Sequence, residues 1–309
     1  MRGLAIVTPV IVEPNMLFTD VPENDYPLHA NSTAYAQGDR VIVAVPTHKI
    51  YECVLAYVSG APAVQPYLDT THWVEVGPTN RWSCLDNKNS SKTAQAGSMY
   101  YRITPGQLPS VAYLDGLVDA TSVRIHVETW SNVTSSYTTV YDKTTQLRSV
   151  PATPSWWQFW FGRRQSRQWV LAMDLPPAPI ASIDIWIEGG ADLAVGVIQV
   201  GQATEFGEGI ELGASGGIQD WSRNEENRWG DMVLTKGAFS KRRRWQLLLK
   251  NTELDAFEDF MAEIRATPCL FIAKDDMSFT RLWGICSRFE PVINMPKHSL
   301  CDLDMKGLI

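Results

Sequence analysis

Trp73-Val-Glu-Val-Gly-Pro-Thr-Asn-Arg-Trp-Ser-Cys-Leu-Asp86 is the stretch of this chain that says most about its fold. A short apolar run from Trp73 to Val76 ends at Gly77-Pro78-Thr79-Asn80, and a second run begins with Arg81-Trp82. Glycine and proline interrupt regular structure, so the pattern predicts a strand, a turn and a second strand. The stretch carries no catalytic motif, and it marks the boundary between two β-rich units.

Length, composition and charge narrow the class of protein. A chain of 309 residues suggests two or three domains, and 45% hydrophobic and 20% charged residues suit well-packed globular domains. The net charge of -7 argues against nucleic acid as the main partner, because binding phosphate requires a basic surface. No stretch is long and apolar enough to span a membrane. The five cysteines are scattered and odd in number, so buried free thiols are favoured over disulfides.

The N-terminal residues predict a strand followed by an extended arm. The first twelve residues contain a short apolar run that is interrupted by Pro9 and followed by no small-residue cleavage site. These features favour a first strand over the alternative, a signal peptide. Pro14, Pro22 and Pro27 then disfavour a compact element. We expect residues 1–32 to form an extended arm of the kind that lies along a neighbouring subunit in an assembly.

Residues 33–80 predict a small β module. Apolar runs over residues 40–45, 50–57 and 73–76 are separated by turn and proline signals. A unit this small needs most of its large side chains for its own core. Its aromatic residues therefore have two interpretations, as the core or as an exposed platform for a sugar. The candidates for glycan contact are Tyr35, Tyr51, Tyr57 and Trp73.

Residues 81–203 predict a β-sandwich. In the stretch 122–128, Val123, Ile125 and Val127 alternate with polar residues and face the core, whereas His126 faces solvent. Many short strands with turn signals and almost no helix are typical of a sandwich or barrel. The other strands predicted in this unit cover residues 137–141, 169–173, 182–188 and 193–199.

The remainder of the chain predicts a linker and an α+β unit. The glycine-rich residues 204–217 lack the lysine and spacing of a phosphate-binding loop, so we expect a linker. Within residues 218–309, apolar residues at helical spacing predict a helix from Asn251 or Thr252 to about residue 266. Its apolar stripe is Leu254, Phe257, Met261 and Ile264, and its flanking strands cover residues 239–249, 269–273, 281–289 and 300–306. The predicted fold class is thus mainly β, with one helix.

An aromatic cluster between residues 155 and 164 does not fit a strand. Five aromatic residues among six do not alternate, so one strand face cannot bury them all. Prolines before the cluster and arginines after it suit a loop tip. We expect this loop to form a protein interface; the alternatives are a cap over the sandwich core and contact with glycan or membrane. The aromatic residues are Trp156, Trp157, Phe159, Trp160 and Phe161.

Lys241-Arg-Arg-Arg244 is the most concentrated cluster of basic residues in the chain. On a strand, Arg242 and Arg244 point to one face, and Lys241 and Arg243 to the other. The acidic helix that follows in the same unit is one expected partner, and an acidic rim of a neighbouring subunit is the other. Arg242 and Arg244 are therefore candidate interface residues.

The sequence contains no arrangement of residues that predicts catalysis. The five histidines lack metal-ligand spacing, and there is no Gly-x-Ser-x-Gly motif. The adjacent carboxylates Glu225-Glu226 and Asp275-Asp276 would point to opposite faces of a strand, so neither is a ready acid and base pair. We expect no enzymatic activity, no metal and no cofactor.

The sequence Gly77-Pro-Thr-Asn-Arg-Trp82, followed by Asp86, resembles a segment of tail-tip and baseplate proteins of tailed bacteriophages. There the segment follows a chitin-binding-type module and precedes a β-sandwich. Tyr35-x-x-Gly-Asp-x-Val41 and Tyr51-Glu-Cys53 resemble such a module. The strand spacing of residues 81–203 is similar to that of the galactose-binding-like jelly roll. Residues 218–309 resemble the sheet domains that phage tail-tip proteins use to ring the tail tube.

This resemblance implies a structural protein of the virion, located in the tail tip or baseplate and assembled in the host bacterial cytoplasm. The implied partners are copies of the same chain, in a trimeric or hexameric ring, and other phage tail proteins. The alternative is a glycan-binding adhesion protein that recognises host surface carbohydrate during host attachment. A carbohydrate-active enzyme is disfavoured because the sequence lacks the carboxylate and histidine arrangements.

Overall fold

The computed structural model describes residues 3–57, 64–131, 136–147, 155–161, 166–176, 181–226, 228–274 and 277–308. The chain is mainly β, as expected, with two large antiparallel sheets, a small three-stranded sheet and a separate hairpin. In the described part of the chain, α2 (Leu254–Glu263) is the only α-helix longer than the six residues of α1 (Trp156–Phe161).

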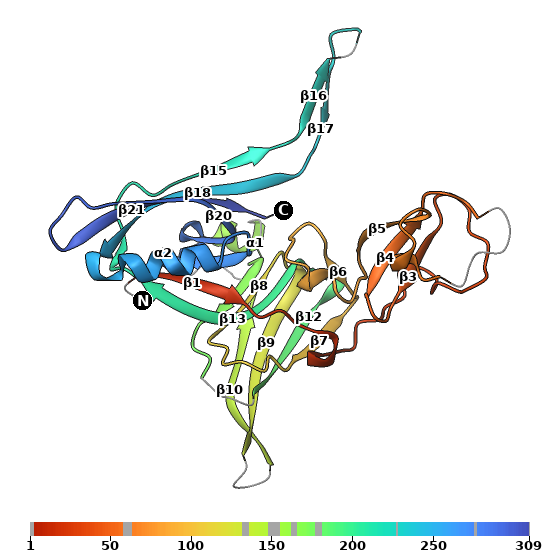
Figure 1. The fold of residues 1–309 in the computed structure, drawn as a ribbon, viewed down its shortest axis with the longest axis horizontal. Helices are drawn as coiled ribbons and strands as arrows, with labels where there is room; N and C mark the ends of the chain where they lie inside the picture. Colours follow the sequence, from red (N-terminus) through yellow and green to blue (C-terminus); the bar gives the residue numbers. More distant parts are fainter. Residues whose placement is uncertain are drawn as a thin grey trace.

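The N-terminal module is a three-stranded sheet that stands out from the rest of the molecule (Figure 1). Its strands are β3 (Arg40–Val43), β4 (Lys49–Cys53) and β5 (Trp73–Pro78), in that order. They agree with the expected apolar runs to within a few residues. The expected second strand after Pro78 is wrong, because backbone hydrogen bonds turn this segment into the 3-10 helix η3 (Ser83–Leu85).

Parts of the two large sheets pack face to face around one core, in an arrangement that resembles the expected sandwich. One sheet has the strand order β10-β9-β12-β7-β2, with β6 beside β12, and it packs against β11, β8 and β13 at one end of the larger sheet. Val123, Ile125 and Val127 of β9 lie in this core, as predicted. The strand bounds are β2 (Leu17–Thr19), β6 (Thr93–Ala94), β7 (Ser98–Ile103), β8 (Val111–Asp115), β9 (Val118–Ser131), β10 (Ser136–Gln146), β11 (Trp169–Ala172), β12 (Ala181–Val195) and β13 (Val197–Phe206).

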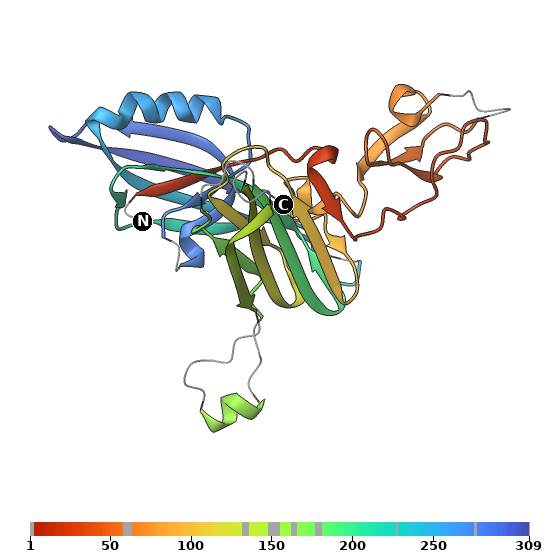
Figure 2. The same ribbon diagram turned by 90° about the horizontal axis from the view of Figure 1, so that it is seen from below.

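The larger sheet continues from the sandwich through the C-terminal part and curls, with α2 lying across one face (Figures 1 and 2). Its order is β11-β8-β13-β1-β19-β20-β21-β18-β14, with β15 also paired to β18. Phe257, Met261 and Ile264 of the predicted helical stripe are buried beneath α2. The remaining bounds are β1 (Leu4–Pro9), β14 (Gly209–Ile210), β15 (Ser215–Asp220), β18 (Phe239–Lys250), β19 (Cys269–Ile272), β20 (Arg281–Val292) and β21 (His298–Gly307).

Strand β1 joins parts of the chain that the sequence separates. It is a strand, as its apolar run predicts, and it pairs with β13 on one side and β19 on the other. Only the later part of residues 1–32 is an extended segment, and this segment packs on its own chain: β2 pairs with β7 and Val21 is buried in the sandwich core. The expectation that the whole stretch is an arm is therefore wrong.

The glycine-rich stretch 204–217 also differs from the expected linker. It contains the end of β13, all of β14 and the start of β15, each paired within the larger sheet. Gly207 has φ of +69°, and a β-carbon there would lie 2.4 Å from the backbone oxygen of Leu248. Glycine is thus needed for close backbone packing.

Candidate interaction surfaces

The aromatic cluster forms the short helix α1, where the sequence suggested a loop. The run Trp-Trp-Gln-Phe-Trp-Phe contains neither glycine nor proline, so nothing in it interrupts a helical turn. Four of its side chains are 63–69% exposed, so they do not cap the sandwich core. The rings of Trp157 and Phe161 lie 4.8 Å apart. These exposed residues are Trp156, Trp157, Trp160 and Phe161; Phe159 lies in the helix, but its side chain is outside the described structure.

A hairpin that the sequence analysis missed projects from the larger sheet (Figure 1). Its strands are β16 (Arg223–Glu226) and β17 (Met232–Thr235), which pair only with each other in the described structure. It carries exposed apolar side chains, including Trp229 at 87% and Leu234 at 72% exposure. The short apolar run over residues 232–235 was the only sequence pattern that could have indicated β17. Four residues are too few to distinguish a strand from a loop.

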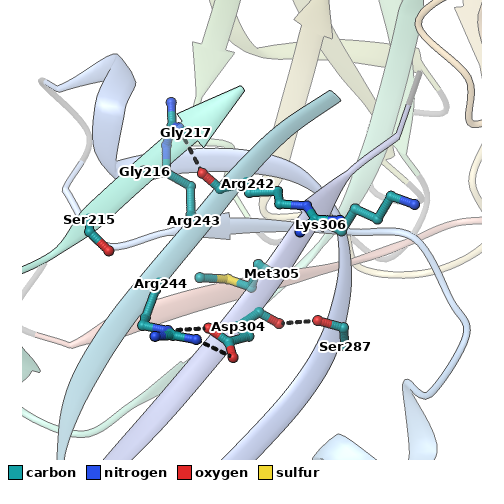
Figure 3. Close-up of a pocket in the computed structure, with 10 residues that line it drawn as sticks. All are labelled: Ser215, Gly216, Gly217, Arg242, Arg243, Arg244, Ser287, Asp304, Met305 and Lys306. Atoms are coloured by element: carbon teal, nitrogen blue, oxygen red, sulfur yellow. Dashed lines mark hydrogen bonds and ion pairs between the residues drawn. The ribbon is translucent and has the colours of Figure 1, made fainter. Parts of the chain in front are cut away.

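A basic groove lies where β15 and β21 flank β18 (Figure 3). Antiparallel pairing places Arg244 opposite Asp304 and Arg242 opposite Lys306, so these four side chains share one face. The groove has a volume of about 430 Å³ and is lined by Ser215, Gly216, Gly217, Arg242, Arg243, Arg244, Ser287, Asp304, Met305 and Lys306.

Within the groove, Arg244 and Asp304 form a bidentate ion pair, with nitrogen–oxygen distances of 2.6 and 3.1 Å (Figure 3). The hydrogen bonds from Arg244 lower the pKa of Asp304. The expected pairing of this cluster with the acidic helix is wrong, because α2 covers the opposite face of β18. Arg242 is exposed and makes no ion pair within the described part of the chain, so the groove keeps a net positive charge.

The four aromatic residues proposed for glycan contact lie together in the module. Two of them are buried in its core, and the other two pack against that core. Trp73 and Tyr51 are only 3% and 4% exposed, whereas Tyr35 and Tyr57 are half-buried. Trp73 Nε1 donates to Tyr57 Oη at 3.0 Å, and Tyr57 Oη donates to Asp69 at 2.6 Å. Burial, with the hydrogen bond to Asp69, raises the pKa of Tyr57 to about 12. The buried rings are closed to a sugar, which leaves exposed surface on Tyr35 and Tyr57.

A charged cluster on the outer face of the sandwich was also missed. Asp184 is fully buried and accepts hydrogen bonds from Arg102 Nε and Tyr100 Oη, both at 2.6 Å. Burial acts to raise the pKa of Asp184, but the hydrogen bonds from Arg102 and Tyr100 outweigh it and lower the pKa. The expectation that His126 is solvated is wrong: it is 8% exposed, and Nδ1 lies 3.6 Å from Asp184.

The Gly-Pro-Thr-Asn-Arg-Trp stretch acts as a joint. Thr79 Oγ1 donates to Glu23 at 2.8 Å, and Arg81 Nε donates to the Val21 carbonyl at 2.8 Å. Asn80 exchanges two side-chain hydrogen bonds with the backbone of Ala94, at 2.8 and 2.9 Å. The stretch therefore ties the N-terminal segment and β6 to the base of the module.

Metal-ligating clusters, membrane spans and disulfides are other features that the described residues could carry. No group of three or more histidine, cysteine or acidic side chains there is arranged to hold a metal ion. Among the same residues, no helix has both the length and the apolar character that a membrane span requires. All five cysteines are free thiols, as expected, and all except the partly exposed Cys286 are buried.

Comparisons with known proteins found no relative. No family model, curated protein or solved structure matches the chain.

Proposed function

We propose that this chain is a structural subunit of a bacteriophage tail tip or baseplate, which assembles with copies of itself and with other tail proteins. The observation that carries the proposal from the structure is α1, whose four described aromatic side chains are 63–69% exposed. Aromatic side chains dominate the central contacts of protein interfaces, and exposed apolar patches mark such interfaces on soluble proteins. The phage resemblance of Gly77-Pro-Thr-Asn-Arg-Trp82 supports the kind of assembly.

The projecting hairpin supports the same role. A two-stranded hairpin is marginally stable alone in water, and β16–β17 pairs with no third strand in the described structure. Its exposed Met232 and Leu234 would gain burial on a neighbouring subunit. The glycan alternative has less support, because Tyr51 and Trp73 are buried in the module. We therefore propose the structural role alone.

The oligomeric state of the full chain tests this proposal. We expect native mass spectrometry and negative-stain electron microscopy of the purified protein to show a closed ring. A Trp157→Ala, Trp160→Ala double variant should lose the ring, since truncating a central aromatic anchor typically costs about 2 kcal/mol or more of binding. The free energy of unfolding of the monomer should change little, because both side chains are exposed.

A Phe18→Ala, Tyr137→Ala double variant is the matched control, because each of these aromatic residues is 64% exposed elsewhere on the surface. It should form the ring normally. A wild-type chain that stays monomeric at every concentration and also fails to bind other tail proteins would refute the proposal. A glycan array would then test the adhesion alternative.

A further inference from the structure

A second cavity lies between the larger sheet and the loops around it. Its volume is about 440 Å³, within the range of sites for small molecules. Three of its aromatic wall residues, Tyr113, Trp169 and Trp283, belong to β8, β11 and β20. Its polar lining comes from loop residues that include Asn89, Ser90, Gln168 and Ser278.

Arg281, the first residue of β20, is the unusual feature of this cavity. It lines the cavity and is only 5% exposed. Its guanidinium has a side-chain hydrogen bond with Tyr113 but forms no ion pair with a described residue. Its Nη1 atom is buried without a partner. A buried guanidinium with an unpaired nitrogen and no ion pair is costly, so such a group points to a partner that binds there.

A second guanidinium, that of Arg167, adds positive charge beside the wall residue Trp169. The central guanidinium carbons of Arg281 and Arg167 lie 3.3 and 3.2 Å from the ring centre of Trp169. Burial lowers the pKa of both arginines, and their mutual repulsion lowers that of Arg167 further. The indole ring stabilises each cation, but it cannot neutralise either one.

The rest of the lining is also basic. Three exposed lysines from separate segments line the cavity, and none of them forms an ion pair with a described residue. Asp115 is the single carboxylate among the lining residues, and it accepts a hydrogen bond from the Gly116 amide. Its charge raises the pKa of Arg281, but the two side chains form no ion pair. The lysines are Lys92, Lys236 and Lys241.

We propose that this cavity binds a small organic oxyanion, either a carboxylate or a phosphate, with Arg281 as its buried contact and the three lysines around it. A planar guanidinium matches the two oxygens of either group, and a partly enclosed site strengthens the attraction. The cavity shares no lining residue with α1 or with the groove at Arg242. It does not depend on the proposed structural role.

Calorimetric titration and thermal melting of the full chain test the site, with inorganic phosphate, citrate and glucuronate as probes and sodium chloride at matched ionic strength as the reference. We expect at least one probe to raise the melting temperature in a saturable way beyond the chloride reference. A response to phosphate alone identifies a phosphate site, and a response to either acid identifies a carboxylate site.

Two variants separate a specific site from general charge effects. Arg281→Met and the exposed double variant Lys92→Ala, Lys241→Ala should each weaken binding about tenfold or more, because each removes charge-assisted contacts. The lysine variant keeps the test decisive if Arg281→Met fails to fold. Lys297→Ala, an exposed lysine at the other end of β21, should bind like wild type. Probes that act no better than chloride, or act equally on the lysine variant, would overturn the proposal.

Discussion

At the scale of single residues, the joint around Thr79 explains why its stretch of sequence stands out. The Glu23 side chain is nearly buried and accepts a hydrogen bond from Thr79 Oγ1 at 2.8 Å. Its carboxylate also lies 3.0 Å from His48 Nδ1 and 3.9 Å from Arg81 Nη1. A buried carboxylate requires such partners. The sequence predicted the turn here from its glycine and proline. It did not predict the hydrogen bond between Thr79 and Glu23, because the two residues are 56 positions apart in the chain.

Removing the Thr79 hydroxyl tests the joint. We expect Thr79→Val to lower the free energy of unfolding by about 1–3 kcal/mol, because it leaves the Glu23 carboxylate short of a donor. Urea denaturation followed by fluorescence measures the change. Thr71→Val, at an exposed position of the same module, should have almost no effect. Equal midpoints for the two variants would show that the joint contributes nothing to stability.

The buried Asp184 makes a pH-dependent contribution. Its folded-state pKa is lowered from the ordinary value of 3.8, so its stabilising effect is complete above that value and is lost as the pH falls through the lowered pKa. We expect Asp184→Asn to destabilise the protein near neutral pH and the difference from wild type to shrink in acid. Urea denaturation at a series of pH values measures this difference. A difference that stays constant with pH would contradict the assignment.

At the scale of elements, the spacing of apolar residues predicted the strands and the helix whose formation depends on neighbouring residues in the chain. Strands β18 to β21 and helix α2 were predicted to within a few residues, because alternation and helical spacing are visible in short windows. The expected strand at residues 193–199 is divided between β12 and β13 at Gly196, which no periodicity marks. The candidate surfaces show the same limit: the exposed cluster of α1 was visible in the sequence, whereas the environment of Arg281 depends on strands distant in the chain.

The projecting hairpin carries its own prediction. Met232 and Leu234 share one face of β17 and are 65% and 72% exposed. If the hairpin contacts a neighbour, Met232→Ser with Leu234→Ser should weaken self-association about tenfold or more, while the stability of the monomer changes by about 0.5 kcal/mol or less. Analytical ultracentrifugation and a thermal melt measure the two quantities.

Val292→Ser with Ile293→Ser, 55% and 71% exposed at the end of β20, is the control for this hairpin variant. It should associate normally. Unchanged association of the β17 variant would remove the hairpin from the interface.

At the scale of the whole molecule, β1 makes one sheet of two regions that the sequence separates. Because β1 pairs with both β13 and β19, the sandwich and the C-terminal part share a continuous ladder of hydrogen bonds. We expect them to unfold in a single transition and to resist limited proteolysis over residues 201–210. Mass spectrometry of the fragments measures cleavage. Rapid cutting in that range would restore the interpretation of residues 204–217 as a linker.

A structural role in the tail is the central claim, and immunogold electron microscopy of purified particles tests it most directly. The proposed role implies that a phage encodes the chain, so the particles are those of that phage. The antibody is raised against the full-length protein. We expect gold at the end of the tail away from the head, in every intact particle. Unlabelled particles, with the protein recovered only from the soluble fraction of the lysate, would contradict it.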